Sequence, residues 1–264
     1  MSTLNFNYNI RSDLPSNPES PASLGAKFVR TVDALSGIDP AVFSNWKVMD
    51  YPARDSLPLA AARSRIAAII DNNVSRDDFG QPNPYRGYSA GAYTDRGSPS
   101  SRGMSLRIRA GGKNAGETSL MAGKYNIFPD AAVVTYPLFK AALLAINAIW
   151  PPAWACACAF GSDFVKVPVN YGDGVRGYRS ESLPPAPSDP TFPYSRFHIP
   201  WLAYLSAHLA AGIELPAEIK TERTPDGGLL MIAAEALLEP TDPEHLKRSR
   251  VLADIMIARA GYRS

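Results

Sequence analysis

Alternating hydrophobic and polar positions open the chain and predict a β-strand with one buried face. Leu4, Phe6, Tyr8 and Ile10 are separated by single asparagines, the period of two that a half-buried strand requires. Residues 104–109 alternate in the same way and place two arginines on the solvent side. From this pattern, and from β-branched and aromatic content, strands are expected at residues 4–10, 46–51, 104–109, 126–135 and 154–160.

Apolar residues spaced three and four positions apart predict helices. The first such run follows Ser20 and Pro21, a capping side chain and a proline that the first helical turn tolerates. Asp242 and Pro243 supply the same start for the last run. The helices expected from this spacing lie at residues 21–36, 58–70, 137–149, 200–211 and from 242 onward.

A turn sequence in the last quarter of the chain predicts a β-hairpin. Asp226, Gly227 and Gly228 separate residues 219–223 from the apolar run 229–233. Aspartate and glycine favour the tight connection between two antiparallel strands. This hairpin and the helices on either side of it are expected to complete the sheet.

Two segments rich in glycine, proline and tyrosine interrupt the pattern, at residues 76–103 and 170–196. Both lack a sustained apolar period and are expected to form long surface loops. The strand and helix pattern on either side reads as one continuing alternation. The sequence therefore predicts a single α+β domain over residues 1–264, with a largely antiparallel sheet packed by helices and two long loops.

Composition and charge reduce the number of protein classes to which this chain can belong. The chain has 264 residues, 45% of them hydrophobic, and is expected to fold as a globular protein. Its formal net charge of +2 is too small to attract the whole molecule toward nucleic acid. The beginning of the chain lacks a secretory pattern. The apolar run 137–154 contains Lys140 and meets two prolines before the roughly 20 residues of a membrane span. We expect a cytoplasmic protein with no membrane partner and no direct contact with nucleic acid.

Candidate chemistry is sparse. The three histidines stand in no recognised metal-ligand spacing, so no metal and no cofactor are expected. Cys156 and Cys158, two apart on an expected strand, are interpreted as core thiols. An enzyme in which Asp226, His245 or Cys158 converge only after folding remains the alternative class.

The two loops supply the candidate binding residues, because tyrosine and arginine are enriched at protein interfaces. The candidate contacts of a partner are Tyr85, Tyr88, Tyr93, Arg96, Asp173, Arg176, Tyr178 and Arg179. The acidic side chains of Asp77 and Asp78 are further candidate contacts of the same partner. Each tyrosine either contacts a partner or packs on the domain, and the sequence does not separate the two.

A nucleic-acid-binding module is a further alternative. Arg96, Arg102, Arg107 and Arg109, with three tyrosines nearby, form the basic and aromatic mixture found on surfaces that bind single strands. Solvated arginines are the preferred interpretation. Retention on nucleic acid that weakens with salt would distinguish the two.

The last quarter resembles the immunity protein 52 family of bacterial polymorphic toxin systems. The resemblance rests on Pro200-Trp201-Leu-Ala-Tyr-Leu205, on residues 222–231 around the Asp-Gly-Gly turn, and on Pro243-Glu-His-Leu246. It implies a non-catalytic cytoplasmic protein that binds and neutralises a cognate nuclease toxin with a restriction-endonuclease-like domain. The setting implied is type VI secretion or a related system. The shared motifs are apolar, turn-forming and capping, so no interface residue carries over.

Overall fold

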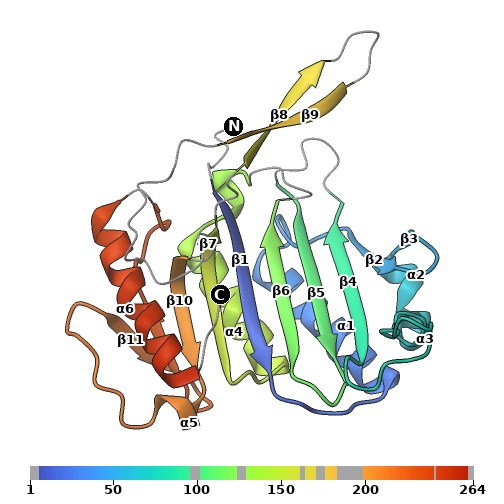
Figure 1. Cartoon of the computed structure of the whole chain (residues 1–264), viewed down its shortest axis with the longest axis horizontal. Helices are drawn as coiled ribbons and strands as arrows, with labels where there is room; N and C mark the ends of the chain where they lie inside the picture. Colours follow the sequence, from blue (N-terminus) through green and yellow to red (C-terminus); the bar gives the residue numbers. More distant parts are fainter. Residues whose placement is uncertain are drawn as a thin grey trace.

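A ten-stranded antiparallel sheet dominates the computed structural model, and helices pack against it (Figure 1). The strand order is β11-β12-β10-β7-β1-β6-β5-β4-β2-β3. The structure describes residues 6–95, 102–123, 129–160, 164–170, 176–182, 199–240 and 242–260. The α+β class expected from the sequence is confirmed.

The strands of the large sheet are β1 (Asn7–Leu14), β2 (Trp46–Asp50), β3 (Asp55–Pro58), β4 (Tyr88–Thr94), β5 (Met104–Ala110), β6 (Gly116–Ala122), β7 (Trp154–Phe160), β10 (Ile199–Leu205), β11 (Lys220–Arg223) and β12 (Leu229–Ile232). Two further strands, β8 (Phe164–Asn170) and β9 (Arg176–Ser182), pair with each other. The helices are α1 (Pro21–Ile38), α2 (Leu59–Ala62), α3 (Ile66–Asn72), α4 (Tyr136–Ile149), α5 (Ala207–Ala210) and α6 (Pro243–Ala260).

The helix starts confirm the capping signals. Ser20 Oγ accepts the backbone N–H of Ser23 at 3.2 Å, and Pro21 occupies the first position of α1. At the start of α6, Asp242 Oδ1 accepts the N–H of Glu244 at 2.8 Å. These bonds satisfy donors that the first helical turn leaves free.

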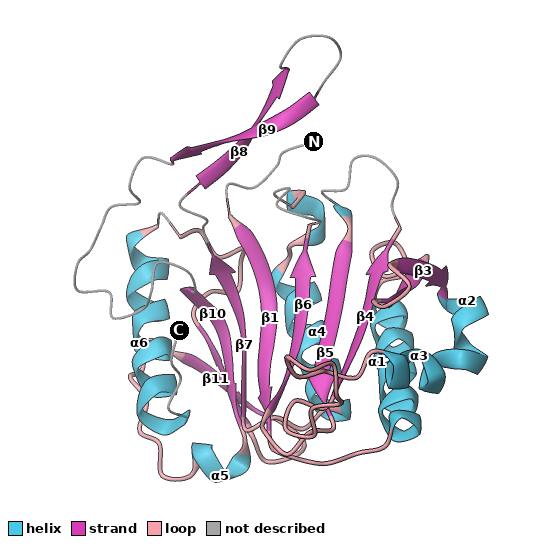
Figure 2. Ribbon diagram, turned by 45° about the vertical axis from the view of Figure 1, so that its right-hand side comes forward, coloured by secondary structure: helices cyan, strands magenta, loops and turns pink. Residues whose placement is uncertain are grey.

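Helices cover the two faces of the sheet unequally. One face carries α1, α3 and α4, whose core side chains include Phe28, Ile69 and Phe139 (Figure 2). On the other face α6 lies against β10 and its neighbours, and Leu252 and Met256 pack with the two cysteines. No described helix covers the β1, β6, β5 and β4 part of that second face (Figure 1). This part of the face therefore lacks a covering helix among the described elements, and Arg107 at its middle is exposed.

The helix expected at residues 200–211 is wrong, because residues 199–205 form strand β10 and only Ala207–Ala210 are helical. Every residue from Pro200 to Leu205 is buried. Both faces of β10 are covered, one by α4 and its neighbours and one by α6, so the strand shows no alternation. A short apolar run of this kind is compatible with a helix or a buried strand by spacing alone.

Other boundaries also differ. A strand was expected at 126–135, but the described part of that segment contains a 3-10 helix at Ala131–Val133, and β6 lies earlier, at Gly116–Ala122. The helix expected at 58–70 is divided, and β3 occupies Asp55–Pro58 before it. In β1, Asn7 and Asn9 were expected to face water but are buried, and the Asn9 side chain accepts the Cys158 thiol. Strands β4 and β9 lie inside the two segments expected to be loops.

Candidate partner-binding surface

The predicted binding residues do not form one site. Tyr85 lies in a loop before β4, whereas Tyr88 and Tyr93 belong to β4 itself. Arg176, Tyr178 and Arg179 lie on β9, where only their backbone pairing with β8 is described. Arg96 and Asp173 lie outside the described residues.

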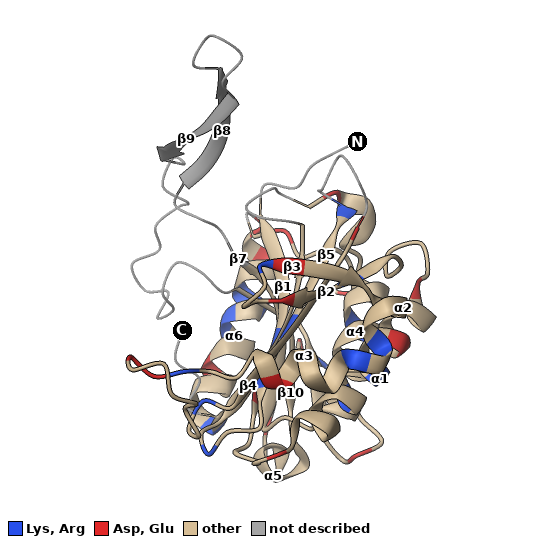
Figure 3. Ribbon diagram, turned by 90° about the vertical axis from the view of Figure 1, so that its right-hand side faces the viewer, with Lys and Arg blue, Asp and Glu red and all other residues tan. Residues whose placement is uncertain are grey.

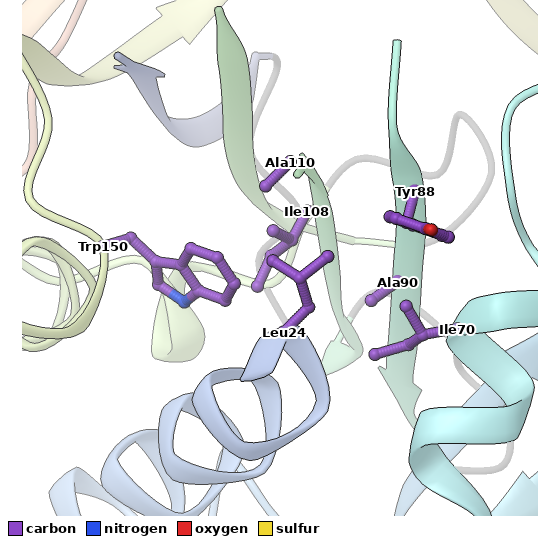
Figure 4. Close-up of a pocket in the computed structure, with 7 residues that line it drawn as sticks. All are labelled: Leu24, Ile70, Tyr88, Ala90, Ile108, Ala110 and Trp150. Atoms are coloured by element: carbon purple, nitrogen blue, oxygen red, sulfur yellow. The ribbon is translucent and has the colours of Figure 1, made fainter. Parts of the chain in front are cut away.

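The two tyrosines of β4 are half-buried and serve the fold. Tyr88 lines a small apolar cavity of about 10 Å³ together with side chains of α1, α3 and β5 (Figure 4). The Tyr93 and Ser56 hydroxyls lie 2.9 Å apart, which links β4 to the edge strand β3. The loop prediction is wrong for this part of the 76–103 segment, because β4 pairs with β5 from Tyr88 to Tyr93.

Residues 75–87, hereafter the tip loop, are ordered by their own hydrogen bonds. Ser75 N–H donates to Gly87 O at 2.8 Å, and Asn83 N–H donates to Ser75 O at 2.7 Å. At the far end Asp77 Oδ1 accepts the N–H groups of Phe79 and Gln81 at 2.9 and 2.8 Å. The Asp77 carboxylate, expected as a possible partner contact, is thus used within the loop.

The tip loop is also anchored to the turn between β5 and β6. Lys113 N–H donates to Pro84 O, and Asn114 N–H donates to Tyr85 O, both at 2.9 Å. Gly87 has a φ of 65°, and a Cβ there would overlap the backbone of Ala110 and Gly112. Only glycine fits this close approach of two chain segments.

Two aromatic side chains project from this ordered loop. Phe79 is 89% exposed and Tyr85 is 56% exposed. The Lys113 ammonium lies 5.6 Å from the centre of the Tyr85 ring, a cation–π distance. Phe79 was missed by the sequence analysis. Phe79 lies between Asp77 and Gly80, two residues that favour turns. This pattern could have predicted that the Phe79 side chain lies at the tip of a turn.

The open part of the sheet carries ordered rows of polar side chains. Cross-strand pairing aligns Gly91, Arg107, Ser119 and Arg11 across β4, β5, β6 and β1. The next row runs through Arg109, whose guanidinium lies 3.3 Å from the carboxylate of Glu117. Glu117 in turn lies opposite Asp13. Burial, and then the nearby Glu117, raises the pKa of Asp13, and Arg11 opposes the change.

Charges of both signs are spread over the molecule. On the side shown in Figure 3, basic and acidic positions are scattered among the described elements. Ion pairs such as Lys47–Asp95 and Lys140–Glu222, each 2.6 Å, take up several of them. Such a surface favours local pairing with a partner over attraction by one overall charge.

The side chains of the alternative enzyme class are each engaged locally. Asp226 accepts the Tyr204 hydroxyl at 2.6 Å, and His245 Nδ1 accepts Glu239 N–H at 3.0 Å. Cys158 is buried, burial raises its pKa, and its thiol donates to Asn9 Oδ1 at 2.6 Å. Within the described ranges, no group of three or more His, Cys, Asp or Glu side chains is placed to hold a metal ion.

One further cleft lies at the carboxy-terminal edge of the large sheet. A cleft of about 440 Å³ lies between the start of β11, the end of β12 and α6, with Lys220, Glu235 and Arg248 in its walls. A 2.6 Å ion pair joins Lys220 and Glu235 at this cleft. None of the described helices combines the length and apolar character that a bilayer crossing requires.

The chain matches no protein-family model and no curated protein sequence. Among solved structures it is similar to Pseudomonas aeruginosa T6SS protein PA0821. The identity is 12% and the TM-score is 0.48, over 98% of this chain and 73% of that chain. A likeness this distant carries no inference about function.

Proposed function

We propose that this chain is an immunity protein that binds and neutralises a cognate nuclease toxin without catalysing a reaction. The observation that carries the proposal is the tip loop, an ordered loop that holds Phe79 at 89% exposure. Aromatic side chains are enriched in the cores of protein interfaces, and a few such residues carry most of the binding energy. The resemblance of the last quarter to the immunity protein 52 family supplies the kind of partner.

The order of the tip loop bears directly on binding. A loop that must become ordered in a complex loses conformational entropy, and this loss weakens the affinity. Here Asp77 and Asn83 already fix the backbone through side-chain bonds to Phe79, Gln81 and Tyr85. The loop backbone that carries Phe79 is therefore fixed before the partner binds. Burial of the Phe79 side chain in a partner pocket would contribute about 1.5–3 kcal/mol to the binding free energy.

The proposed setting is the cytoplasm of the producing cell, within a T6SS or a related polymorphic toxin system. The T6SS protein to which the chain is distantly similar is compatible with this setting but carries no argument for it. Because the formal net charge is only +2, the chain offers no strongly charged substitute for nucleic acid. Of the two ways to inhibit a nuclease, plugging its active site or binding elsewhere, this charge favours the second, and we propose that binding prevents the toxin from assembling or engaging its substrate.

The test is co-expression of the chain with a nuclease encoded beside it, with cell survival as the readout. Wild type is expected to restore growth, and Phe79→Ala combined with Tyr85→Ala is expected to lose protection. Ile257→Ala on α6 removes an exposed apolar side chain elsewhere and is the matched control. If wild type gives no protection against any neighbouring nuclease, the proposed function is wrong.

If both the double variant and the control protect as well as wild type does, binding does not depend on the tip loop. The immunity function would then stand without this interface. Circular dichroism and a thermal melt of each variant would show that a loss of protection is not a loss of folding.

A further inference from the structure

The open part of the sheet face is a second surface with the composition of an interface. It lies on the same side of the sheet as α6, because Arg11 and Asn9 pair across β1 and β7 with Cys156 and Cys158, which pack against that helix. Beyond α6 the described chain places no helix over β1, β6, β5 and β4 (Figure 1). Within this area Arg107 is exposed, and Arg11, Arg109, Glu117 and Ser119 are partly exposed.

Arg107 occupies the centre of this area and has no partner of its own among the described residues. It is exposed, and its cross-strand neighbours are Gly91, which has no side chain, and Ser119, which has a short one. Nearby cations are already engaged, Arg109 with Glu117 at 3.3 Å and Lys47 with Asp95 at 2.6 Å. The Arg107 guanidinium therefore keeps its donors for a ligand.

Apolar and aromatic side chains lie directly beside Arg107. A Cβ built on Gly91 would overlap the Tyr51 hydroxyl and would lie 3.2 Å from Met49 Sδ, so both side chains rest over the Gly91 backbone. Tyr51 is 38% exposed. Tyrosine, methionine and arginine are the residue types enriched in the cores of protein interfaces.

We propose that this open sheet face is a docking surface for the toxin, and that Arg107 binds an aspartate or glutamate carboxylate of that partner. The inference rests on the proposed immunity function and names how the partner is recognised. A guanidinium fork matches a carboxylate with two parallel hydrogen bonds, and flanking apolar contacts exclude water from such a pair.

A protein carboxylate fits this surface better than a nucleic-acid phosphate. Asp95 and Glu117 pair with the neighbouring Lys47 and Arg109, so the face offers no continuous row of free cations for a phosphate backbone. A protein partner meets only a few charges at chosen positions and offers apolar groups to Tyr51 and Met49. The face thus suits one isolated carboxylate within a mixed surface.

The test measures the affinity of the full chain for the purified nuclease domain identified by the co-expression assay. Arg107→Glu is compared with Arg107→Lys and with Arg30→Glu. Arg30 is an exposed arginine of α1, in the helical layer on the other side of the sheet, with no partner among the described residues (Figure 2). It therefore reproduces the charge change away from the proposed surface.

We expect Arg107→Glu to weaken binding about tenfold or more, Arg107→Lys to weaken it less, and Arg30→Glu to change it by less than about twofold. Equal affinity of wild type and Arg107→Glu would overturn the inference while leaving the proposed function intact. If wild type neutralises no nuclease, both are overturned. Arg107-dependent retention of a single-stranded DNA of about 20 nucleotides would instead assign the face to nucleic acid and overturn the protein assignment.

Discussion

The Tyr204 hydroxyl donates a 2.6 Å hydrogen bond to Asp226 Oδ2 and so joins β10 to the turn between β11 and β12. The same carboxylate accepts the Thr224 hydroxyl and, at 3.1 Å, the N–H of Gly228. The Tyr204 ring rests on Gly228, where any Cβ would overlap it. These contacts make the Asp-Gly-Gly turn a fixed corner of the carboxy-terminal sheet edge.

Replacing Asp226 with asparagine is expected to destabilise the chain in a pH-dependent way. Burial raises the pKa of Asp226, but the bonds from Thr224, Tyr204 and Gly228 outweigh it and hold the pKa below its ordinary value of 3.8. A lowered folded pKa contributes stability above 3.8, and this contribution is lost as the pH falls through the folded pKa. Because Asp226 is exposed, we expect a cost of only about 1 kcal/mol near neutral pH.

The measurement is urea unfolding of wild type and Asp226→Asn at neutral pH and at several values below 3.8. The difference in unfolding free energy should shrink toward the acidic end. Asp78→Asn, at an exposed carboxylate with no hydrogen bond among the described residues, should show no difference at either end. A gap for Asp226→Asn that is constant with pH would contradict the account.

Two glycines of the tip loop are expected to respond very differently to alanine. Gly80 and Gly87 have φ values of 78° and 65°, so both substitutions strain the backbone. Around Gly80 a Cβ would meet nothing within 4 Å, and the expected cost is about 1 kcal/mol. At Gly87 the Cβ would overlap the backbone of Ala110 and Gly112, and we expect about 2 kcal/mol or more together with a loosened tip loop.

Thermal unfolding and hydrogen exchange of residues 75–87 check this prediction. Gly87→Ala should raise the exchange rates of the loop amides and lower the protection of cells against the toxin. Gly80→Ala should leave exchange at Ser75 and Asn83 unchanged. Equal effects of the two substitutions would show that the anchor to the β5–β6 turn does not order the loop.

Replacing Asn147 with leucine is expected to stabilise the chain. Asn147 lies on α4, is 4% exposed, and has no hydrogen-bond partner for either side-chain polar atom among the described residues. A buried amide without partners loses its hydration without compensation, and an apolar group of similar size removes that cost. We expect a gain of about 1 kcal/mol in unfolding free energy.

Asn9→Leu is the matched control for Asn147→Leu. Asn9 is also buried, at 7% exposure, but its Oδ1 accepts the Cys158 thiol. The control should therefore destabilise the chain in the same denaturation experiment. A loss of stability in both variants would mean that Asn147 has a partner that the substitution removes.

Local signals in the sequence were sufficient to predict where several helices and strands begin or turn. Helix α1 begins where Ser20 and Pro21 indicate, and the β11–β12 hairpin turns at Asp226. In both cases the residues that determine the structure are adjacent in the chain. Strand β4 was hidden because Gly91 and its small neighbours have the composition of a loop, and only contact with Tyr51 explains that glycine.

The candidate surfaces were harder to predict. Tyr85 and Tyr88 were equal candidates in the sequence, but Tyr85 is 56% exposed whereas Tyr88 packs against the core, because composition alone does not determine exposure. The outward position of Arg107 followed from alternation. The accessibility of Arg107 depends on which strands α6 covers. Tertiary packing sets this position of α6, and no local sequence pattern predicts it.

The most direct test of the proposed function is a titration of the purified nuclease with increasing amounts of this chain, with DNA degradation as the readout. The account predicts that activity falls in proportion to added chain and is abolished at about one molar equivalent, because a tight stoichiometric complex forms. Unchanged activity with the chain in excess would contradict the account. Complete loss of activity at a small fraction of an equivalent would also contradict it, because that result requires catalytic turnover.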